Sequence, residues 1–191
     1  AYANAPAAFD RWMLALAMLA LAAALSISPW DAELSRRATA SPDTFVRTLA
    51  AYTDIGKSTL YLLSALAVTV WLSLRDWRRR HLSAKARFAL LYSQAAFAFA
   101  AIAGSGILVN VFKFIFARAR PKFLDELGPY DFFGRMGVGY DFTSFPSGHS
   151  TTMGALAAIL ALWYPKLRIL TIPACFIGAA SRVAAAAHFP S

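Results

Sequence analysis

The chain has 191 residues, a length that suits a single domain. Hydrophobic residues make up 59% of it and charged residues only 15%, against about 25% charged residues in soluble domains, so the composition favours a membrane protein. The net charge of +9 is compatible with nucleic acid, anionic lipid or phosphate ligands, and the positions of the charges decide among them. The single cysteine, Cys175, excludes a disulfide between two of these residues and a cysteine-rich metal site.

Five apolar segments follow one another along the chain, and each is a candidate membrane helix. A helix that crosses a bilayer needs about 20 mainly apolar residues. Arg182 is the one charged residue within the five segments. The segments are residues 12–29, 58–74, 88–112, 150–164 and 169–187.

The connections between these segments differ in charge. Residues 75–87 include six Lys or Arg and one acid, and residues 164–168 carry two basic residues and no acid. Short loops rich in Lys and Arg stay in the cytoplasm, which places the N-terminus there as well. Segments 31–57 and 118–149 each hold four acidic and four basic residues, and they fall on the outer face. Topology thus explains the densest basic cluster, and we expect no nucleic-acid partner and no obligate protein partner.

The outer segment 118–149 lies between the third and fourth apolar segments and is rich in Gly and Pro. Structureless connections of this length are uncommon and are often functional. The expected fold is therefore an all-α polytopic transmembrane bundle with a long outer loop between spans three and four.

Three groups of polar residues border the apolar segments. Lys113 and Arg120 follow the third segment, Ser147, Gly148 and His149 precede the fourth, and Arg182 and His188 close the fifth. The topology inferred from charge places all three groups at the outer face.

The three cations suit an anionic ligand. Lys113 and Arg120 are seven residues apart, which on one helix corresponds to two turns and nearly one face, although snorkelling cations at a helix end would look the same. Arg182 lies inside an apolar span, where a charge is costly, and no acid in residues 150–191 can pair with it. A bound anion is the simplest partner.

Pro146-Ser147-Gly148-His149 precedes an apolar helix, whose free N–H groups would favour a phosphate. A plain helix start with Ser147 or Ser150 as cap is the alternative. His149 and His188 suggest a general acid and a nucleophile, whereas His81 lies in the basic loop. Two histidines without nearby carboxylates, among cations, do not form a metal site, so we expect no metal and no cofactor.

Together these motifs resemble the type 2 phosphatidic acid phosphatase family, which includes glucose-6-phosphatase and the vanadium haloperoxidases. The family motifs are Lys-x6-Arg-Pro, Pro-Ser-Gly-His and Ser-Arg-x5-His-x3-Asp. The chain matches the first at Lys113 and Arg120-Pro121, the second at residues 146–149, and the third at Ser181-Arg182 and His188. The resemblance covers residues 52–191.

The resemblance implies roles for these residues. His188 would attack phosphorus to form a phosphohistidine, and His149 would protonate the leaving group. The cations Lys113, Arg120 and Arg182, together with Ser147 and Gly148, would bind the phosphate oxygens. The family's Asp would be the fourth residue after His188, beyond Ser191, and a sixth span would follow it. We therefore expect residues 1–191 to be one membrane-embedded phosphatase domain with five of six spans, truncated before the last helix.

The expected function is metal-independent hydrolysis of a lipid phosphate monoester or diphosphate at the outer face of a bacterial inner membrane. Phosphatidic acid, phosphatidylglycerol phosphate, undecaprenyl diphosphate and lipid A phosphates remain open as substrates. The alternatives are a phosphotransferase that moves the phosphate to an alcohol and a non-catalytic membrane protein with a decayed site.

Overall fold

The computed structural model describes residues 11–77, 81–134 and 139–191, and within these every regular element is helical. The all-α prediction is confirmed. Arg78, Arg79 and Arg80 of the basic loop and Gly137 of the outer segment lie outside the described residues. The α-helices are α1 (Arg11–Ile27), α2 (Asp31–Ala40), α3 (Thr44–Ala51), α4 (Ser58–Ser73), α5 (Leu82–Phe116), α6 (Leu124–Leu127), α7 (Gly148–Trp163) and α8 (Arg168–Ala184).

Each of the five apolar segments contains a helix, but the helices do not all qualify as membrane spans. Among the described residues, three helical runs are long and apolar enough to cross a bilayer, namely Thr44–Ser73, Leu82–Leu127 and Pro165–Ala184. The helices α1 and α7 have 17 and 16 residues. Large apolar side chains on the three runs face outward, for example Leu60 at 71% exposure and Ile169 at 81%. Such exposure is unfavourable in water and suits a lipid solvent.

The ends of two helices differ from the sequence-based prediction. Helix α5 runs from Leu82 to Phe116, beyond the apolar segment at both ends, and stops where Ala117 adopts a left-handed conformation with φ 43°. Arg120 follows in extended backbone with φ −79° and ψ 157°. The prediction that Lys113 and Arg120 share a helix face is therefore wrong. Helix α8 ends at Ala184, earlier than predicted, so His188 lies outside regular structure.

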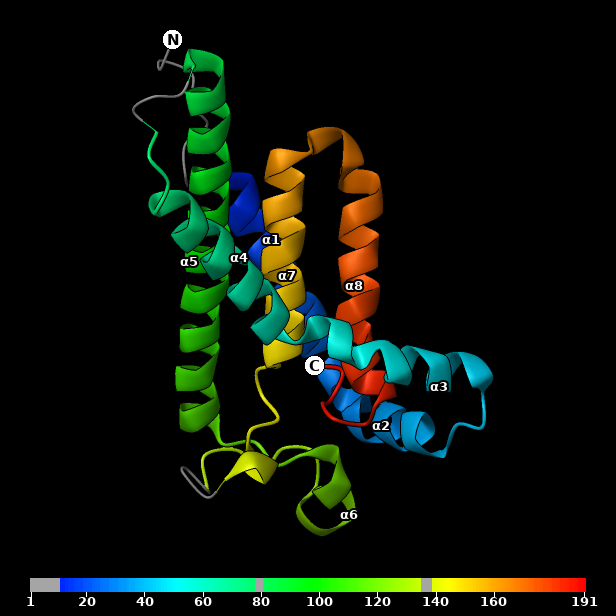
Figure 1. The fold of residues 1–191 in the computed structure, drawn as a ribbon. Coiled ribbons are helices and arrows are strands. Elements are labelled where there is room, and N and C mark those ends of the chain that lie inside the picture. Colours follow the sequence, from blue (N-terminus) through cyan, green and yellow to red (C-terminus); the bar gives the residue numbers. More distant parts are fainter. Residues whose placement is uncertain (1–10, 78–80, 135–138) are drawn as a thin grey trace.

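Helices α7 and α8 form an antiparallel hairpin, and α5 runs along α7 (Figure 1). The turn between α7 and α8 is a short 3-10 helix, Pro165–Leu167. Gly178 lets the hairpin close tightly, because a Cβ atom there would lie 2.6 Å from Sδ of Met153. Small residues commonly permit such close approach between membrane helices.

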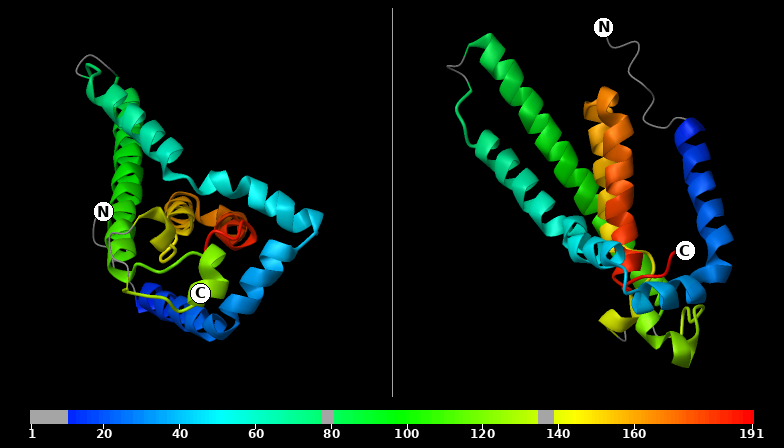
Figure 2. Two further views of the ribbon diagram at one scale, coloured as in Figure 1. Left: turned by 90° about the horizontal axis from the view of Figure 1, so that it is seen from below. Right: turned by 90° about the vertical axis from the view of Figure 1, so that its right-hand side faces the viewer.

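The segment 31–57, expected to be an outer connection, is largely helical. Helices α2 and α3 lie crosswise to α7 and α8 at the end of the bundle where the C-terminal segment lies (Figures 1 and 2). Asp43 caps α3, its carboxylate accepting a hydrogen bond from the Phe45 N–H at 2.8 Å. A 3-10 helix, η2 (Tyr52–Gly56), then joins α3 to α4 and packs against α7 and α8.

The segment between α5 and α7 also contains short helices in its described part. These are η3 (Pro121–Phe123), α6 and η4 (Tyr140–Phe142). The segment lies at the same end of the molecule as α2 and α3 (Figure 1).

Candidate active site

The structure brings the three predicted groups of residues together. The C-terminal end of α5, the N-terminal end of α7 and the C-terminal end of α8 point toward the same end of the bundle (Figure 1). The ends of α5 and α7 touch, since a Cβ atom on Gly148 would lie 3.5 Å from Nζ of Lys113. The positive charges of Arg120, Arg182 and Lys113 all act on the imidazole of His188. The three cations and the two motif-borne histidines thus share one region.

Arg120 is fixed by bonds to the main chain on two sides. Its Nη1 donates to the carbonyl of Ala187 at 3.0 Å, and its Nε donates to the carbonyl of Tyr140 at 3.1 Å. The guanidinium also lies over the Tyr140 ring, 3.9 Å from its centre. Arg120 therefore joins the outer segment to the residue that precedes His188.

Arg182 is 7% exposed and only partly satisfied by protein. Its Nη1 donates to Oγ1 of Thr53 in η2 at 2.9 Å, and Ser181 Oγ donates to the same oxygen at 3.2 Å. Its Nε is buried and has no hydrogen-bond partner among the described residues. A buried guanidinium with a spare donor is costly unless an anion binds it.

His149 lies in the first turn of α7 against η2. A Cβ atom on Gly56 would be only 2.8 Å from Cβ of His149 and 3.0 Å from its Cδ2, so a glycine is required for this contact. Its Nε2 is buried and, in the described part of the chain, has no hydrogen-bond partner. One ring nitrogen is therefore left to interact with a ligand.

His188 is 4% exposed, and its ring orientation is set by one hydrogen bond. Nδ1 lies 2.5 Å from the carbonyl oxygen of Ser144. Because a carbonyl can only accept, Nδ1 carries the proton and Nε2 keeps its lone pair. This is the tautomer that a nucleophilic Nε2 requires.

The charge state of His188 suits the same role. Burial, together with the nearby cations Arg120, Arg182 and Lys113, lowers the pKa of His188 from 6.5 to about 3, while the hydrogen bond to Ser144 opposes the shift. The ring is therefore neutral at neutral pH and available as a nucleophile.

Ser147 caps α7, as the alternative interpretation of this motif proposed. Its Oγ accepts a hydrogen bond from the N–H of Ser150 at 3.3 Å. Gly148 is the first residue of the helix, next to Lys113. The N-terminus of α7 thus faces the cationic region, where its free N–H groups could add to phosphate binding.

Sequence reasoning missed three residues that contact the predicted ones. Thr53 accepts from Arg182, Ser144 accepts from His188, and Tyr140 stacks on Arg120. Tyr140 and Ser144 belong to the outer segment whose length and Gly/Pro content marked it as functional. No local sequence pattern marks Thr53 as a site residue, because a threonine before an apolar helix is common in any protein.

A cavity of about 690 Å³ opens beside this region. Ser147, Arg182 and His188 are among the residues that line it. Apolar side chains form much of its remaining wall, including Ile27, Leu34, Val46, Leu49, Phe176 and Val183. The cavity therefore combines residues of the candidate site with a mainly apolar wall.

Long apolar helices in the described residues, with cations and histidines gathered at one end of the bundle, characterise an integral membrane protein. The profile of the PAP2 superfamily matches residues 94–191, about half of the chain and all three motifs. The chain belongs to this superfamily.

Two curated relatives share part of the sequence. Lipid A 1-phosphatases of Rhizobium etli and Rhizobium johnstonii are each 40% identical to the chain over 96 residues, which is 50% of its length. The match covers 41% and 39% of these relatives, so the chain spans well under two thirds of their length. No solved structure matches the chain significantly.

Proposed function

We propose that this chain is the catalytic region of an integral membrane phosphatase that hydrolyses a lipid phosphate through a phosphohistidine on His188. The observation that carries the proposal is a cluster of three cations, the buried Arg120 and Arg182 and the half-buried Lys113, around a buried neutral histidine whose Nε2 keeps its lone pair. The unpartnered nitrogens of Arg182 and His149 add two more groups that need a ligand in the described structure. A phosphate meets all of these requirements at once.

In the proposed reaction the Nε2 lone pair of His188 attacks phosphorus, and the bond from phosphorus to the leaving oxygen breaks. His149 gives a proton to that oxygen, so that it leaves as an alcohol. A water molecule then attacks the phosphohistidine, His149 takes the water's proton, and inorganic phosphate leaves with His188 restored. Lys113, Arg120 and Arg182 offset the negative charge of the phosphoryl oxygens in both steps.

The cavity beside His188 supports a lipid as substrate. Arg182 and His188 in its lining would hold the phosphate, and its apolar wall would accommodate acyl chains. The names of the two relatives make the 1-phosphate of lipid A the first substrate to test. The proposed location is a bacterial inner membrane with the active site on its outer face, because the basic connections mark the cytoplasmic side. An epitope at Gly134 should then be accessible from outside.

The decisive experiment measures phosphate release from lipid A 1-phosphate and from phosphatidic acid by the full-length protein in detergent. His188→Ala should abolish release. The matched control is His81→Ala, since His81 is exposed and lies at the start of α5. Wild-type enzyme given a ³²P-labelled substrate and quenched with alkaline detergent should carry label that is stable to base and released by acid. Activity in His188→Ala, or no label on active enzyme, would reject the phosphohistidine.

We expect hydrolysis to survive EDTA, because the three fixed cations perform the charge neutralisation that metal ions perform in many phosphatases. Phosphate release with and without EDTA, before and after Mg²⁺ addition, tests this. Complete loss with EDTA and recovery with Mg²⁺ would contradict the proposed mechanism. Orthovanadate should inhibit, since it mimics five-coordinate phosphorus.

A further inference from the structure

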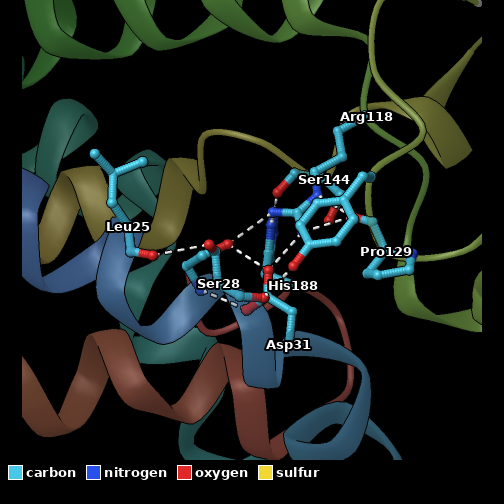
Figure 3. A network of polar contacts seen from close by, with 9 residues as sticks. Leu25, Ser28, Asp31, Arg118, Pro129, Ser144 and His188 are labelled. Atoms are coloured by element: carbon cyan, nitrogen blue, oxygen red, sulfur yellow. Dashed lines mark hydrogen bonds and ion pairs between the residues drawn. The ribbon is translucent and has the colours of Figure 1, made fainter.

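A buried ion pair lies behind the candidate site. Oδ2 of Asp31, at the start of α2, is 2.6 Å from Nη2 of Arg118, two residues after α5 (Figure 3). The side chains are 0% and 2% exposed. Removing two charges from water is costly, so such a pair persists only where further hydrogen bonds satisfy it.

Those hydrogen bonds are present. Arg118 donates from Nε and Nη2 to the carbonyl of Pro129 at 3.1 and 2.8 Å, and from Nη1 to Oγ of Ser191 at 3.1 Å. Asp31 accepts from the backbone N–H of Ser191 at 3.0 Å and from its hydroxyl at 2.5 Å. The guanidinium lies between two rings, 4.1 Å from the centre of Phe189 and 4.9 Å from that of Phe132.

Two of these partners, Phe189 and Ser191, are the first and third residues after His188. Helix α8 ends at Ala184, so no helical hydrogen bonds hold the segment 188–191. Its contacts are with side chains and loop carbonyls. His188 itself bonds to Ser144, whose N–H in turn donates to the carbonyl of Arg118 at 3.0 Å (Figure 3).

We infer that Arg118 and Asp31 are positioning residues for His188, an inference that rests on the proposed function. Arg118 holds the nucleophile from two sides, through its main chain by way of Ser144 and through its side chain by way of Phe189. Asp31 binds both the guanidinium of Arg118 and Ser191, the third residue after His188. The pair therefore sets the geometry of attack, and phosphate binding is left to Lys113, Arg120 and Arg182.

The expected signature is a loss in kcat with little change in phosphate affinity. A displacement of about 1 Å in a reacting group can cost about 100-fold in rate. We expect Arg118→Met to lower kcat about 100-fold, whereas KM and the inhibition constant of inorganic phosphate should stay within about threefold of wild type.

A double variant separates positioning from stability. Arg118→Met alone leaves the buried carboxylate of Asp31 without a cation, a change that can prevent folding. Asp31→Leu/Arg118→Met replaces the pair with apolar side chains, a change that is often neutral or stabilising for a buried ion pair. We expect the double variant to recover the thermal midpoint of the wild type while its kcat stays about 100-fold low.

Arg36→Gln is the matched control. Arg36 also lies on α2 and pairs with Asp125 at 2.9 Å, but both side chains are exposed, at 59% and 84%. Its loss should leave kcat and the thermal midpoint unchanged, as is usual for exposed pairs. A second variant, Arg118→Lys, keeps the charge, but a lysine ammonium cannot donate to the Pro129 carbonyl and to Ser191 at the same time. We expect this variant to lower kcat about tenfold.

Either of two results would overturn the inference. One is a folded double variant with kcat within about threefold of wild type, and the other is an Arg118→Lys variant with full kcat. Should the double variant fail to fold, Arg118→Lys decides alone. An inactive wild-type protein would instead contradict the proposed function, because His188→Ala and Arg36→Gln would then give no difference.

Discussion

The two ends of the helical bundle use the same residue types in opposite ways. At the site end, Arg118, Arg120 and Arg182 are buried, with 2–7% of their surface exposed. At the other end, Arg75 and Arg168 are exposed, Arg75 lying over the Trp71 ring and Arg168 donating to the carbonyl of Ala161 at 3.1 Å. Exposed arginines remain hydrated and need no ligand. Buried arginines must find acceptors, and where the protein supplies too few, the remaining donors mark a binding site.

Histidine shows the same contrast. His81 is exposed at the start of α5, within 3.4 Å of the hydroxyl of Ser83. His188 is buried and oriented by a carbonyl, and Nε2 of His149 is buried without a partner among the described residues. Burial and a fixed tautomer, rather than the presence of an imidazole, distinguish the candidate catalytic residues.

The largest loss of activity is expected when a histidine of the site end, His149, is replaced, in comparison with His81 at the other end. His149→Ala should lower kcat/KM on a lipid phosphate by about 10²- to 10⁴-fold, because the lipid alkoxide leaves poorly without a proton. On p-nitrophenyl phosphate the loss should be much smaller, since nitrophenolate needs little protonation. Steady-state kinetics on both substrates make the measurement, with His81→Ala as control. Equal losses on both substrates would reject His149 as the general acid.

The next largest loss of activity is expected when an arginine of the site end is replaced. Arg182→Met removes one of three cations from the phosphate site and should lower kcat by about 10²- to 10³-fold, as for one preorganised donor in other enzymes. Arg168→Met, at the opposite end of the same helix, should have no effect. The thermal midpoint of both variants checks that they fold. Equal activity of the two variants would remove the basis for assigning Arg182 to phosphate.

A smaller effect is expected from glycine. Gly56→Ala should displace His149, because the added Cβ would lie 2.8 Å from the histidine Cβ, and we expect about a tenfold loss in kcat/KM. The loss should be larger on the lipid than on p-nitrophenyl phosphate, following His149→Ala. Gly104→Ala, in α5 with no atom within 4 Å of the new Cβ, is the control. A loss independent of leaving group would show that η2 does not act through His149.

The smallest effect concerns pH and stability. The folded protein keeps His188 neutral with a pKa of about 3, below the 6.5 of the unfolded chain. The unfolded state therefore binds a proton first, and the stabilisation present above pH 6.5 is lost as pH falls toward 3. Thermal midpoints between pH 7 and about pH 4 should fall by a few degrees less in His188→Gln than in wild type. If the thermal midpoints of both proteins changed with pH to the same extent, the buried neutral state of His188 would be contradicted.

Some of this protein could be predicted from local sequence. Composition and apolar run length predicted an all-helical membrane protein, because helices satisfy their own backbone hydrogen bonds in lipid. Motif spacing predicted the family, which the match over residues 94–191 confirms. The catalytic and phosphate-binding roles of the individual residues stay predictions. The prediction that Lys113 and Arg120 share a helix face was wrong. Apolarity and spacing do not reveal that Ala117 adopts a left-handed backbone conformation and ends α5.

The sequence by itself determined the residue types and their order along the chain, because apolar runs, charge asymmetry and short motifs are local properties. Only the tertiary structure decided which groups meet. Thr53 reaches Arg182 across 129 positions, and Asp31 reaches Arg118 across 87. Such contacts depend on how η2 and α2 cross the end of the bundle, which no local pattern specifies. The burial that holds His188 neutral is likewise a consequence of this packing.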